Sequence, residues 1–407
     1  MVTRSASVQR TGARAKKRSA ARSNAAVDSA STYITIVTFA LVLLGLVMVL
    51  SASFVSQLTN SGSPFLYVQR QLMWVGIGLV SFFVFSRLDY KRLKGTGYIL
   101  ILMVGALLVA VLVPGVGQSV GGSARWLGVG SLSFQPSEVA KLALILFAAD
   151  VFSRKQEARL DNLSHTLLPM VPVLGCLTGL IMMQPDLGTT MIIGTIGLGM
   201  LVIAGSPMRF IAPIAGLGMA AATFAALIEP ERRSRVMTFL DPWAQPLGDG
   251  YQTIQGLIAL GSGGWFGVGL GASRQKWSYV PNAHTDYIFA ILGEEMGLIG
   301  SFVVLGLFVA LAYLGLRSAR LARDRFGMLL ASGITIWITV QALVNIGAVT
   351  ASLPITGVPL PLVSFGGSSL VLTLAGMGIL TNIARQGRAS ARSSSAENRK
   401  KRERSRR

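Results

Sequence analysis

The residues with the clearest chemical potential are His284, Thr285 and Asp286, in the stretch PNAHTDYIFA. Mostly apolar residues follow from Tyr287, so the carboxylate of Asp286 stands where an apolar segment begins. No Lys or Arg adjoins it in the sequence to neutralise its charge. Burial near lipid raises the pKa of a carboxyl group, as a general base at neutral pH requires. Asp286 is therefore the candidate catalytic base, oriented by Thr285 and His284, and a helix cap is its structural alternative.

Two cations, Arg274 and Lys276, stand shortly before this acid and form a second candidate group. Guanidinium and ammonium groups bind phosphate oxygens through charge-assisted hydrogen bonds. We expect both side chains to be exposed and to bind a phosphate or diphosphate, with Arg125 as a further candidate. Anchoring at lipid headgroups is the structural alternative. The glycine run at 261–271 lacks the GK[ST] ending of a phosphate loop, so it predicts tight turns rather than nucleotide binding.

Polar residues within apolar segments form a third group, because ionisable side chains in a membrane need a partner or a function. Glu138 and Lys141 are three residues apart in QPSEVAK, so they share a helix face and predict an ion pair. We expect this pair to line an outward-facing polar cavity and contact substrate, and a structural ion pair that holds the bundle is the compatible alternative. In QPDLGTT, we expect Asp186 to cap the following helix, with direct substrate contact as the alternative, and Gln184 to support it. Glu294, about two helical turns after the candidate base, is a further supporting residue.

The stretch LPITGVPLPLVSFGGSS leads into the last apolar segment. Irregular backbone at membrane depth is tolerated where it is buried in protein or lines a cavity. We therefore expect this stretch to form the wall of a groove, with Pro361, Gly366 and Gly367 as structural residues and Ser368 toward the substrate.

The residue types do not define a metal site. His165 and His284 are predicted on opposite sides of the membrane, and the single cysteine, Cys176, lies in an apolar run. Asp286 alone offers too few ligands for a hard cation such as Mg²⁺ or Mn²⁺ without substrate phosphates. The sequence thus indicates no certain cofactor and leaves a divalent cation open.

These residues lie in a chain whose composition is typical of a helical membrane protein. Of its 407 residues, 52% are hydrophobic and 13% are charged, whereas a soluble domain carries about 25% charged residues. Apolar runs of about 20 residues recur, and each is long enough to cross a hydrocarbon core of about 30 Å. The sequence predicts an all-α polytopic membrane protein with about ten spans, at 32–53, 70–87, 97–114, 136–153, 166–183, 187–205, 208–228, 286–315, 327–350 and 367–385.

The distribution of positive charge predicts the topology. An even number of spans places both basic tails on one side, and the short basic loops fall on that side, which is the cytoplasm by the positive-inside rule. The long loops then face outward, and the loop 229–285 is expected to contain short helices on or in the membrane surface. We expect a disordered basic tail at 1–30, a membrane domain at 31–386 and a second disordered basic tail at 387–407.

The tails carry most of the net charge of +20. Attraction to anionic lipid headgroups accounts for such segments, and docking of a cytoplasmic partner is the alternative. Nucleic acid is not an expected partner, because neither a recognition fold nor an aromatic platform accompanies the charge.

Taken in order, QPSEVAK, QPDLGTT, GLGASRQKWSYVPNAHTDYIFAILGEEMG and PLPLVSFGGSS resemble the motifs of the SEDS family of peptidoglycan glycosyltransferases. The resemblance covers the membrane body and excludes both tails. The combination of GLGASRQKW with AHTD and the segment DPWAQPLGDGYQ are similar to the FtsW branch, and PITGVPLPLVS is closer to the RodA branch. The family fold implies ten helices, a large extracytoplasmic loop between the seventh and eighth, and catalysis at the outer face.

The same resemblance implies a substrate and partners. The substrate would be lipid II, a disaccharide-pentapeptide on undecaprenyl diphosphate, added to a growing undecaprenyl-linked glycan strand. Asp286 matches the family's essential acid, and Glu138 and Lys141 match the pair lining its central cavity. A class B penicillin-binding transpeptidase and other membrane proteins of the division machinery are the implied partners, at the septum of a bacterium. A lipid II flippase and a non-catalytic division scaffold are the competing interpretations.

Overall fold

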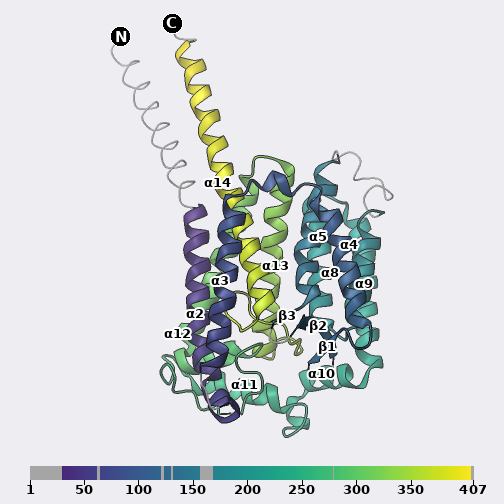
Figure 1. Ribbon diagram of the computed structural model, residues 1–407, viewed down its shortest axis with the longest axis vertical. Coiled ribbons are helices and arrows are strands. Elements are labelled where there is room, and N and C mark those ends of the chain that lie inside the picture. Colours follow the sequence, from purple (N-terminus) through teal and green to yellow (C-terminus); the bar gives the residue numbers. More distant parts are fainter. Residues whose placement is uncertain are drawn as a thin grey trace, which may run out of the picture.

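The computed structural model describes residues 30–61, 65–120, 123–129, 132–155, 168–277 and 279–404. His165 lies outside the described residues. Long helices stand side by side and run between two ends of the molecule (Figure 1). These helices are α2 (Ala30–Ser61), α3 (Leu66–Arg87), α4 (Thr96–Leu112), α5 (Pro136–Ser153), α7 (Val171–Met182), α8 (Leu187–Ala204), α9 (Met208–Ile228), α12 (Ile288–Arg320), α13 (Arg325–Val349) and α14 (Gly367–Arg404).

Each of the ten predicted spans coincides with one of these helices, so the helical membrane class is confirmed. Among the described residues, seven helices are long and apolar enough to cross a membrane, namely α2, α3, α8, α9, α12, α13 and α14. The apolar helices α4 and α7 are shorter. The remaining helix, α5, carries three buried charged residues, Glu138, Lys141 and Asp150.

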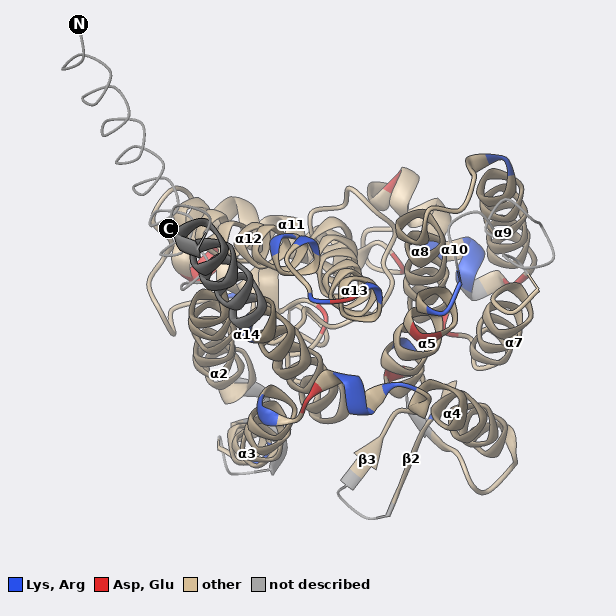
Figure 2. Ribbon diagram, turned by 90° about the horizontal axis from the view of Figure 1, so that it is seen from above, with Lys and Arg blue, Asp and Glu red and all other residues tan. Residues whose placement is uncertain are grey.

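The last helix, α14, ends at the same end of the molecule at which α2 begins (Figure 1). Seen from above that end, Lys and Arg mark several of the connections between helices (Figure 2). The opposite end carries the small sheet and two shorter helices, α10 (Pro230–Leu240) and α11 (Tyr251–Ser262). The loop at 229–285 therefore contains helices, as its apolar pieces predicted.

Two features differ from the sequence predictions. Residues expected to form an irregular loop contain a three-stranded antiparallel sheet, β1 (Gln118–Val120), β2 (Ser123–Val129) and β3 (Leu132–Phe134), because short runs between glycines pair as hairpins. The tail from 387, expected to be disordered, continues α14 as a helix to Arg404. This segment contains many good helix formers such as Ala, Arg and Lys.

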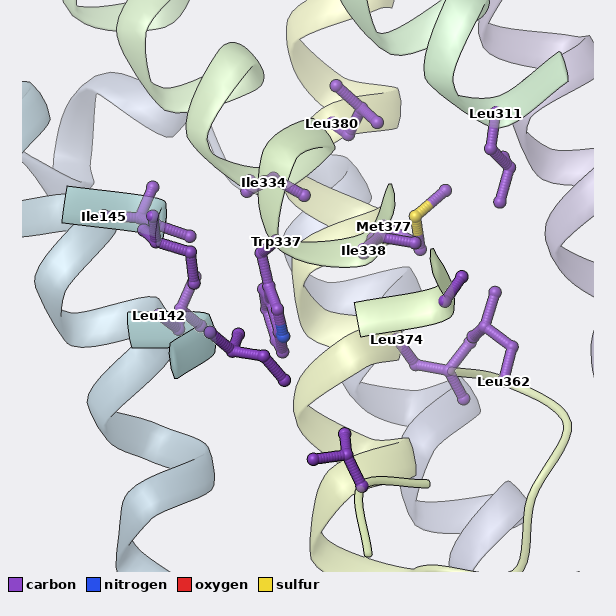
Figure 3. Close-up of a cluster of buried hydrophobic side chains, with 14 of the residues drawn as sticks. Leu142, Ile145, Leu311, Ile334, Trp337, Ile338, Leu362, Leu374, Met377 and Leu380 are labelled. Atoms are coloured by element: carbon purple, nitrogen blue, oxygen red, sulfur yellow. The ribbon is translucent and has the colours of Figure 1, made fainter. Parts of the chain in front are cut away.

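One part of the hydrophobic core lies where α5, α13 and α14 meet. Trp337 of α13 is fully buried and lies between Leu142 and Ile145 of α5 and Leu374 of α14 (Figure 3). Small residues allow the closest approaches: a Cβ on Gly378 of α14 would lie 2.5 Å from a carbonyl oxygen of α3. Helices in membranes commonly pack through such small residues, because lipid provides little hydrophobic force between them.

The helix α12 is broken at Gly297, whose φ of 67° and ψ of −167° are not helical. The glycine-rich loop before α12 supplies the missing hydrogen bonds. The N–H of Leu298 donates to the carbonyl of Gly264 at 2.9 Å, and the N–H of Val268 donates to the carbonyl of Glu294 at 3.0 Å. The part of α12 after the break is about 34 Å long by its helical rise, enough to cross a bilayer. The glycine run thus forms tight turns, as predicted, and repairs the broken helix.

Candidate functional site

Asp286 lies in the turns that precede α12. α12 begins at the end of the molecule that carries the sheet and α10 (Figure 1). The hydroxyl of Thr285 donates to Oδ1 of Asp286 at 3.0 Å, and a Cβ on Gly357 would lie 4.0 Å from Oδ2. Burial raises the pKa of Asp286 from 3.8 to about 6, and the hydrogen bond from Thr285 and the charge of Arg235 partly oppose the rise. The carboxylate is thus held against the irregular segment before α14, and it titrates close to neutral pH.

The backbone at Asp286 is fixed by an amide of α13. Nδ2 of Asn345 donates to the carbonyl of Asp286 at 2.7 Å and to the carbonyl of Val358 at 2.8 Å. One helical turn earlier, Nε2 of Gln341 donates to the carbonyl of Pro359 at 3.0 Å. These two amides, the amide clamp hereafter, hold the turn at Asp286 and the segment 354–366 together. Because this segment has no regular secondary structure, its carbonyls depend on such side-chain donors.

Glu138 and Lys141 form the predicted ion pair, with 2.7 Å between Oε1 and Nζ and both side chains buried. Lys141 also donates to Oε1 of Gln341 at 2.8 Å and lies 5.4 Å from the centre of the Trp337 ring. The indole N–H of Trp337 donates to the same oxygen at 2.9 Å. The pair is therefore connected to the amide clamp, and through it to the turn at Asp286. Oε2 of Glu138 is buried without a hydrogen-bond partner.

His284 is placed differently from the prediction. Its ring stacks on Tyr67 at 4.5 Å and meets Phe365 edge-on at 5.7 Å, and burial lowers its pKa to about 4. Its carbonyl accepts a hydrogen bond from the N–H of Phe365 at 2.9 Å. Within the described residues its ring has no hydrogen bond to Asp286. His284 is thus a neutral ring that packs the turn against α3, whereas Thr285 orients the acid as expected.

Of the two predicted phosphate ligands, only Arg274 is exposed. Lys276 is 7% exposed, forms an ion pair with Glu295 at 3.3 Å and donates to Ser51 of α2. The expectation of an exposed Lys276 is therefore wrong, because a buried carboxylate already neutralises it. Glu294 holds this loop, since it accepts hydrogen bonds from the N–H groups of Arg274, at 2.9 Å, and Gln275, and from the hydroxyl of Ser273.

Arg125 of β2 is also occupied within the protein. Its Nε donates to the carbonyl of Gln184 at 3.0 Å, and its guanidinium also donates to the carbonyl of Pro185. The side chain of Gln184 donates to the carbonyl of Leu108 in α4 at 3.0 Å. Both residues therefore fix the turn between α7 and α8. The guanidinium of Arg125, a candidate phosphate ligand from the sequence, is bound to these backbone carbonyls.

Asp186 caps α8, as predicted. Its Oδ1 accepts from the N–H of Thr189 at 3.1 Å, and its Oδ2 accepts from the Thr189 hydroxyl at 2.9 Å and from Gln135 at 3.2 Å. The hydroxyl of Ser368, at the start of α14, accepts from the N–H of Gln135 at 3.3 Å. Ser368 is thus buried and joins α14 to the start of α5.

The segment 354–366 is irregular, as its prolines and glycines predicted. Pro361 is buried within it, and a Cβ on Gly367 would lie 2.3 Å from the ring of Trp74, so only glycine fits there. Gly366 has no such close neighbour: a Cβ there would lie 3.7 Å from Ser369. A Cβ on Gly45 of α2 would lie 2.6 Å from the backbone of this segment.

Sequence reasoning missed Gln341, Asn345, Glu295 and Arg235 as site residues. A signal existed for the two amides, since they are four residues apart within the apolar segment 327–350 and therefore share a helix face. Glu295 adjoins the predicted Glu294. No local pattern distinguishes Arg235, because its relation to Asp286 depends on how the long loop folds.

The described part of the chain brings no three His, Cys, Asp or Glu side chains together as metal ligands. Asp286 has a hydroxyl and a glycine as neighbours rather than a second carboxylate. Since Mg²⁺ takes most of its ligands from oxygen atoms in octahedral geometry, these protein groups alone do not form a cation site.

The fold and this site define a multi-pass helical membrane protein with a partly buried acid at one end of its helix bundle. The family model described as a cell cycle protein, covering FtsW, RodA and SpoVE, matches residues 31–389. The chain therefore belongs to the FtsW/RodA/SpoVE family, as its motifs indicated.

Individual relatives agree with this assignment. Stage V sporulation protein E of Bacillus subtilis is 42% identical over 359 residues, which cover 87% of this chain and 97% of the relative. The probable peptidoglycan glycosyltransferase FtsW of Aliivibrio salmonicida is 43% identical over 352 residues, which cover 85% of this chain and 87% of the relative.

Solved structures share the fold. A structure described as showing the coordination of polymerization and crosslinking by a peptidoglycan synthase complex matches with a TM-score of 0.69 and 31% identity, over 87% of this chain and 97% of that chain. The rod shape determining protein RodA of Thermus thermophilus matches with a TM-score of 0.64 and 28% identity, over 86% of this chain and 95% of that chain.

Proposed function

We propose that this protein is a peptidoglycan glycosyltransferase that polymerises lipid II at the outer face of the bacterial cytoplasmic membrane, with Asp286 as general base. The observation that carries the proposal is the partly buried carboxylate of Asp286, oriented by Thr285, with a pKa of about 6. A base of this pKa is largely ionised at neutral pH and still basic enough to accept a proton. The names of the relatives favour this transferase over a lipid flippase or a scaffold.

In the proposed reaction, Asp286 accepts the proton of the 4-hydroxyl of the acceptor sugar. The hydroxyl oxygen forms a bond to the anomeric carbon of the growing strand, and the bond from that carbon to undecaprenyl diphosphate breaks with inversion. The diphosphate leaves with the electron pair of the broken bond. The exposed guanidinium of Arg274 is available to stabilise the negative charge, whereas Lys276 and Arg125 are held by internal partners.

Glu138 and Lys141 act on the reaction through the amide clamp. Lys141 fixes Gln341, whose amide holds the segment that faces Asp286, while Asn345 holds the backbone of Asp286 itself. Displacing a catalytic group by about 1 Å can lower a rate about 100-fold. The ion pair thus positions the base, and this role is consistent with its burial between α5 and α13.

Partners and location follow from the same proposal. A class B penicillin-binding transpeptidase would act on the strands that this protein makes, since a relative of known structure belongs to a complex that coordinates polymerization and crosslinking. Both termini would be cytoplasmic, in accord with the common end of α2 and α14, and the protein would act at the division septum. Lipid II and the undecaprenyl-linked strand would reach Asp286 from the outer leaflet.

The test is polymerisation of lipid II by purified Asp286→Asn, with Thr223→Ala in α9 as a control away from the site. Asp286→Asn should remain folded, as judged by thermal unfolding and size-exclusion chromatography, and produce no glycan strands on gels. The control should polymerise like the unmodified chain. Full polymerisation by Asp286→Asn would rule out the general-base role.

A further inference from the structure

A cavity of about 320 Å³ lies between the end of α9 and the start of α10. Its walls combine apolar and polar side chains: Leu227 and Ile228 close α9, and Pro230, Arg233, Ser234 and Met237 come from α10. None of these residues takes part in the hydrogen bonds around Asp286. The volume is within the range of small-molecule sites in proteins, about 300–1,000 Å³.

Arg233 is the charged residue that lines this cavity, and no described protein group binds its guanidinium. Its side chain is exposed, and within the described residues it has neither a hydrogen bond nor an ion pair. Two other cations of the same end are paired within the protein: Arg232 pairs with Glu229 at 2.9 Å, and Lys276 pairs with Glu295. A free arginine beside an apolar wall fits a ligand that is anionic at one end and apolar at the other.

The position of the cavity identifies the source of such a ligand. α9 is apolar enough to cross a membrane, and only 11% of its most apolar window is buried within the protein, so most of its surface faces lipid. Leu227 and Ile228 belong to its last turn and are 48% and 64% exposed. The cavity therefore lies where the hydrocarbon of a bilayer gives way to headgroups.

The helix that carries Arg233 is held in place before any ligand binds. Arg232 donates to the carbonyl of Met182 at the end of α7, at 3.3 Å, and Ser234 donates to Asp249. Residues on either side of Arg233 thus anchor α10 to the bundle and to the following loop. Such preorganisation lowers the entropy cost of binding.

We propose that this cavity binds the phosphate headgroup of a membrane lipid, with Arg233 on the phosphate and Leu227, Ile228 and Met237 against the beginning of the chains. The lipid is either a glycerophospholipid or a polyprenyl phosphate, since both present a phosphate on an apolar chain. The site is separate from Asp286, so it does not depend on the proposed glycosyltransferase activity.

The test is lipid binding to the purified full chain in detergent, measured by native mass spectrometry. The probes are phosphatidylglycerol, undecaprenyl phosphate, diacylglycerol and inorganic phosphate. We expect Arg233→Ala to bind the preferred phosphate lipid about tenfold more weakly, as loss of a hydrogen bond to a charged group predicts. Arg92→Ala, which removes an exposed arginine from η1 (Tyr90–Leu93) at the other end, should bind like the unmodified chain.

The outcomes separate the possibilities. Preference for phosphatidylglycerol or for undecaprenyl phosphate identifies the lipid, and recovery by Arg233→Lys confirms that charge is required. Equal binding of diacylglycerol would overturn the proposal, because the phosphate would then contribute nothing. Equal affinity of Arg233→Ala and Arg92→Ala for the phosphate lipids would overturn it as well. Asp286→Asn should bind these lipids normally, so failure of the catalytic proposal would leave this result unchanged.

Discussion

The pKa of Asp286 makes the pH dependence of polymerisation the sharpest test of its role. With a pKa of about 6, the carboxylate is about 90% ionised at pH 7 and about 10% ionised at pH 5. Only the ionised form accepts a proton from the acceptor hydroxyl, so the rate should fall about tenfold between these pH values. An ordinary aspartate, with a pKa of 3.8, would remain ionised at pH 5 and show almost no change.

Two variants move the pKa in a known direction. Thr285 donates to Oδ1 at 3.0 Å, and Arg235 contributes a favourable charge, so each lowers the pKa of Asp286. Thr285→Val and Arg235→Gln should therefore raise the pKa and shift the rising limb of the pH profile to higher pH. Arg92→Gln removes a distant exposed charge and serves as the control, with no expected shift.

The assay is the initial rate of glycan synthesis from lipid II between pH 5 and pH 8, with the purified protein and its cognate transpeptidase. Thermal unfolding at each pH establishes that the folded fraction stays constant. A flat profile between pH 5 and pH 7 in the unmodified chain would falsify the assignment of a buried base with a raised pKa. A shift of the limb to lower pH in Thr285→Val would contradict the hydrogen bond as its cause.

Three further predictions follow from buried contacts. Lys141→Met should lower the free energy of unfolding by about 3–5 kcal/mol in chemical denaturation, because it leaves Glu138 buried without a partner, and adding Glu138→Gln should restore part of the loss. Asn345→Leu should lower kcat by about 100-fold with little change in KM, since it frees the backbone of Asp286, and an unchanged kcat would refute the positioning role. Arg274→Ala should raise KM for lipid II without a loss of thermal stability, whereas Lys276→Ala should lower the melting temperature.

Much of the helix arrangement could be predicted from the sequence, because it depends on local patterns. Apolar runs located the helices, and Asp186 signalled the cap of α8. The spacing of Glu138 and Lys141 predicted their ion pair, since both residues belong to one helix. The position of Asp286 before an apolar segment likewise predicted a partly buried acid.

The remaining features depend on contacts between distant segments. Lys276 looked like a free cation because Glu295, nineteen residues later, reaches it only after α12 folds back on the glycine loop. Arg125 contacts the turn at Gln184 across fifty-nine residues, and no local pattern reveals that pairing. The spacing of Gln341 and Asn345 indicates a shared polar face within an apolar helix, but it does not reveal which distant backbone carbonyls the two amides bind.

The break at Gly297 has a consequence for how this protein would behave in membranes of different thickness. A spanning helix that is longer than the bilayer tilts to accommodate it. In α12, the glycine loop is hydrogen bonded to both sides of the break, and Ile288–Met296 continues directly from the turn that the amide clamp holds. We therefore expect a tilt of the later part of α12 to move Asp286 less than it would in an unbroken helix, because the glycine loop and α13 also hold this turn.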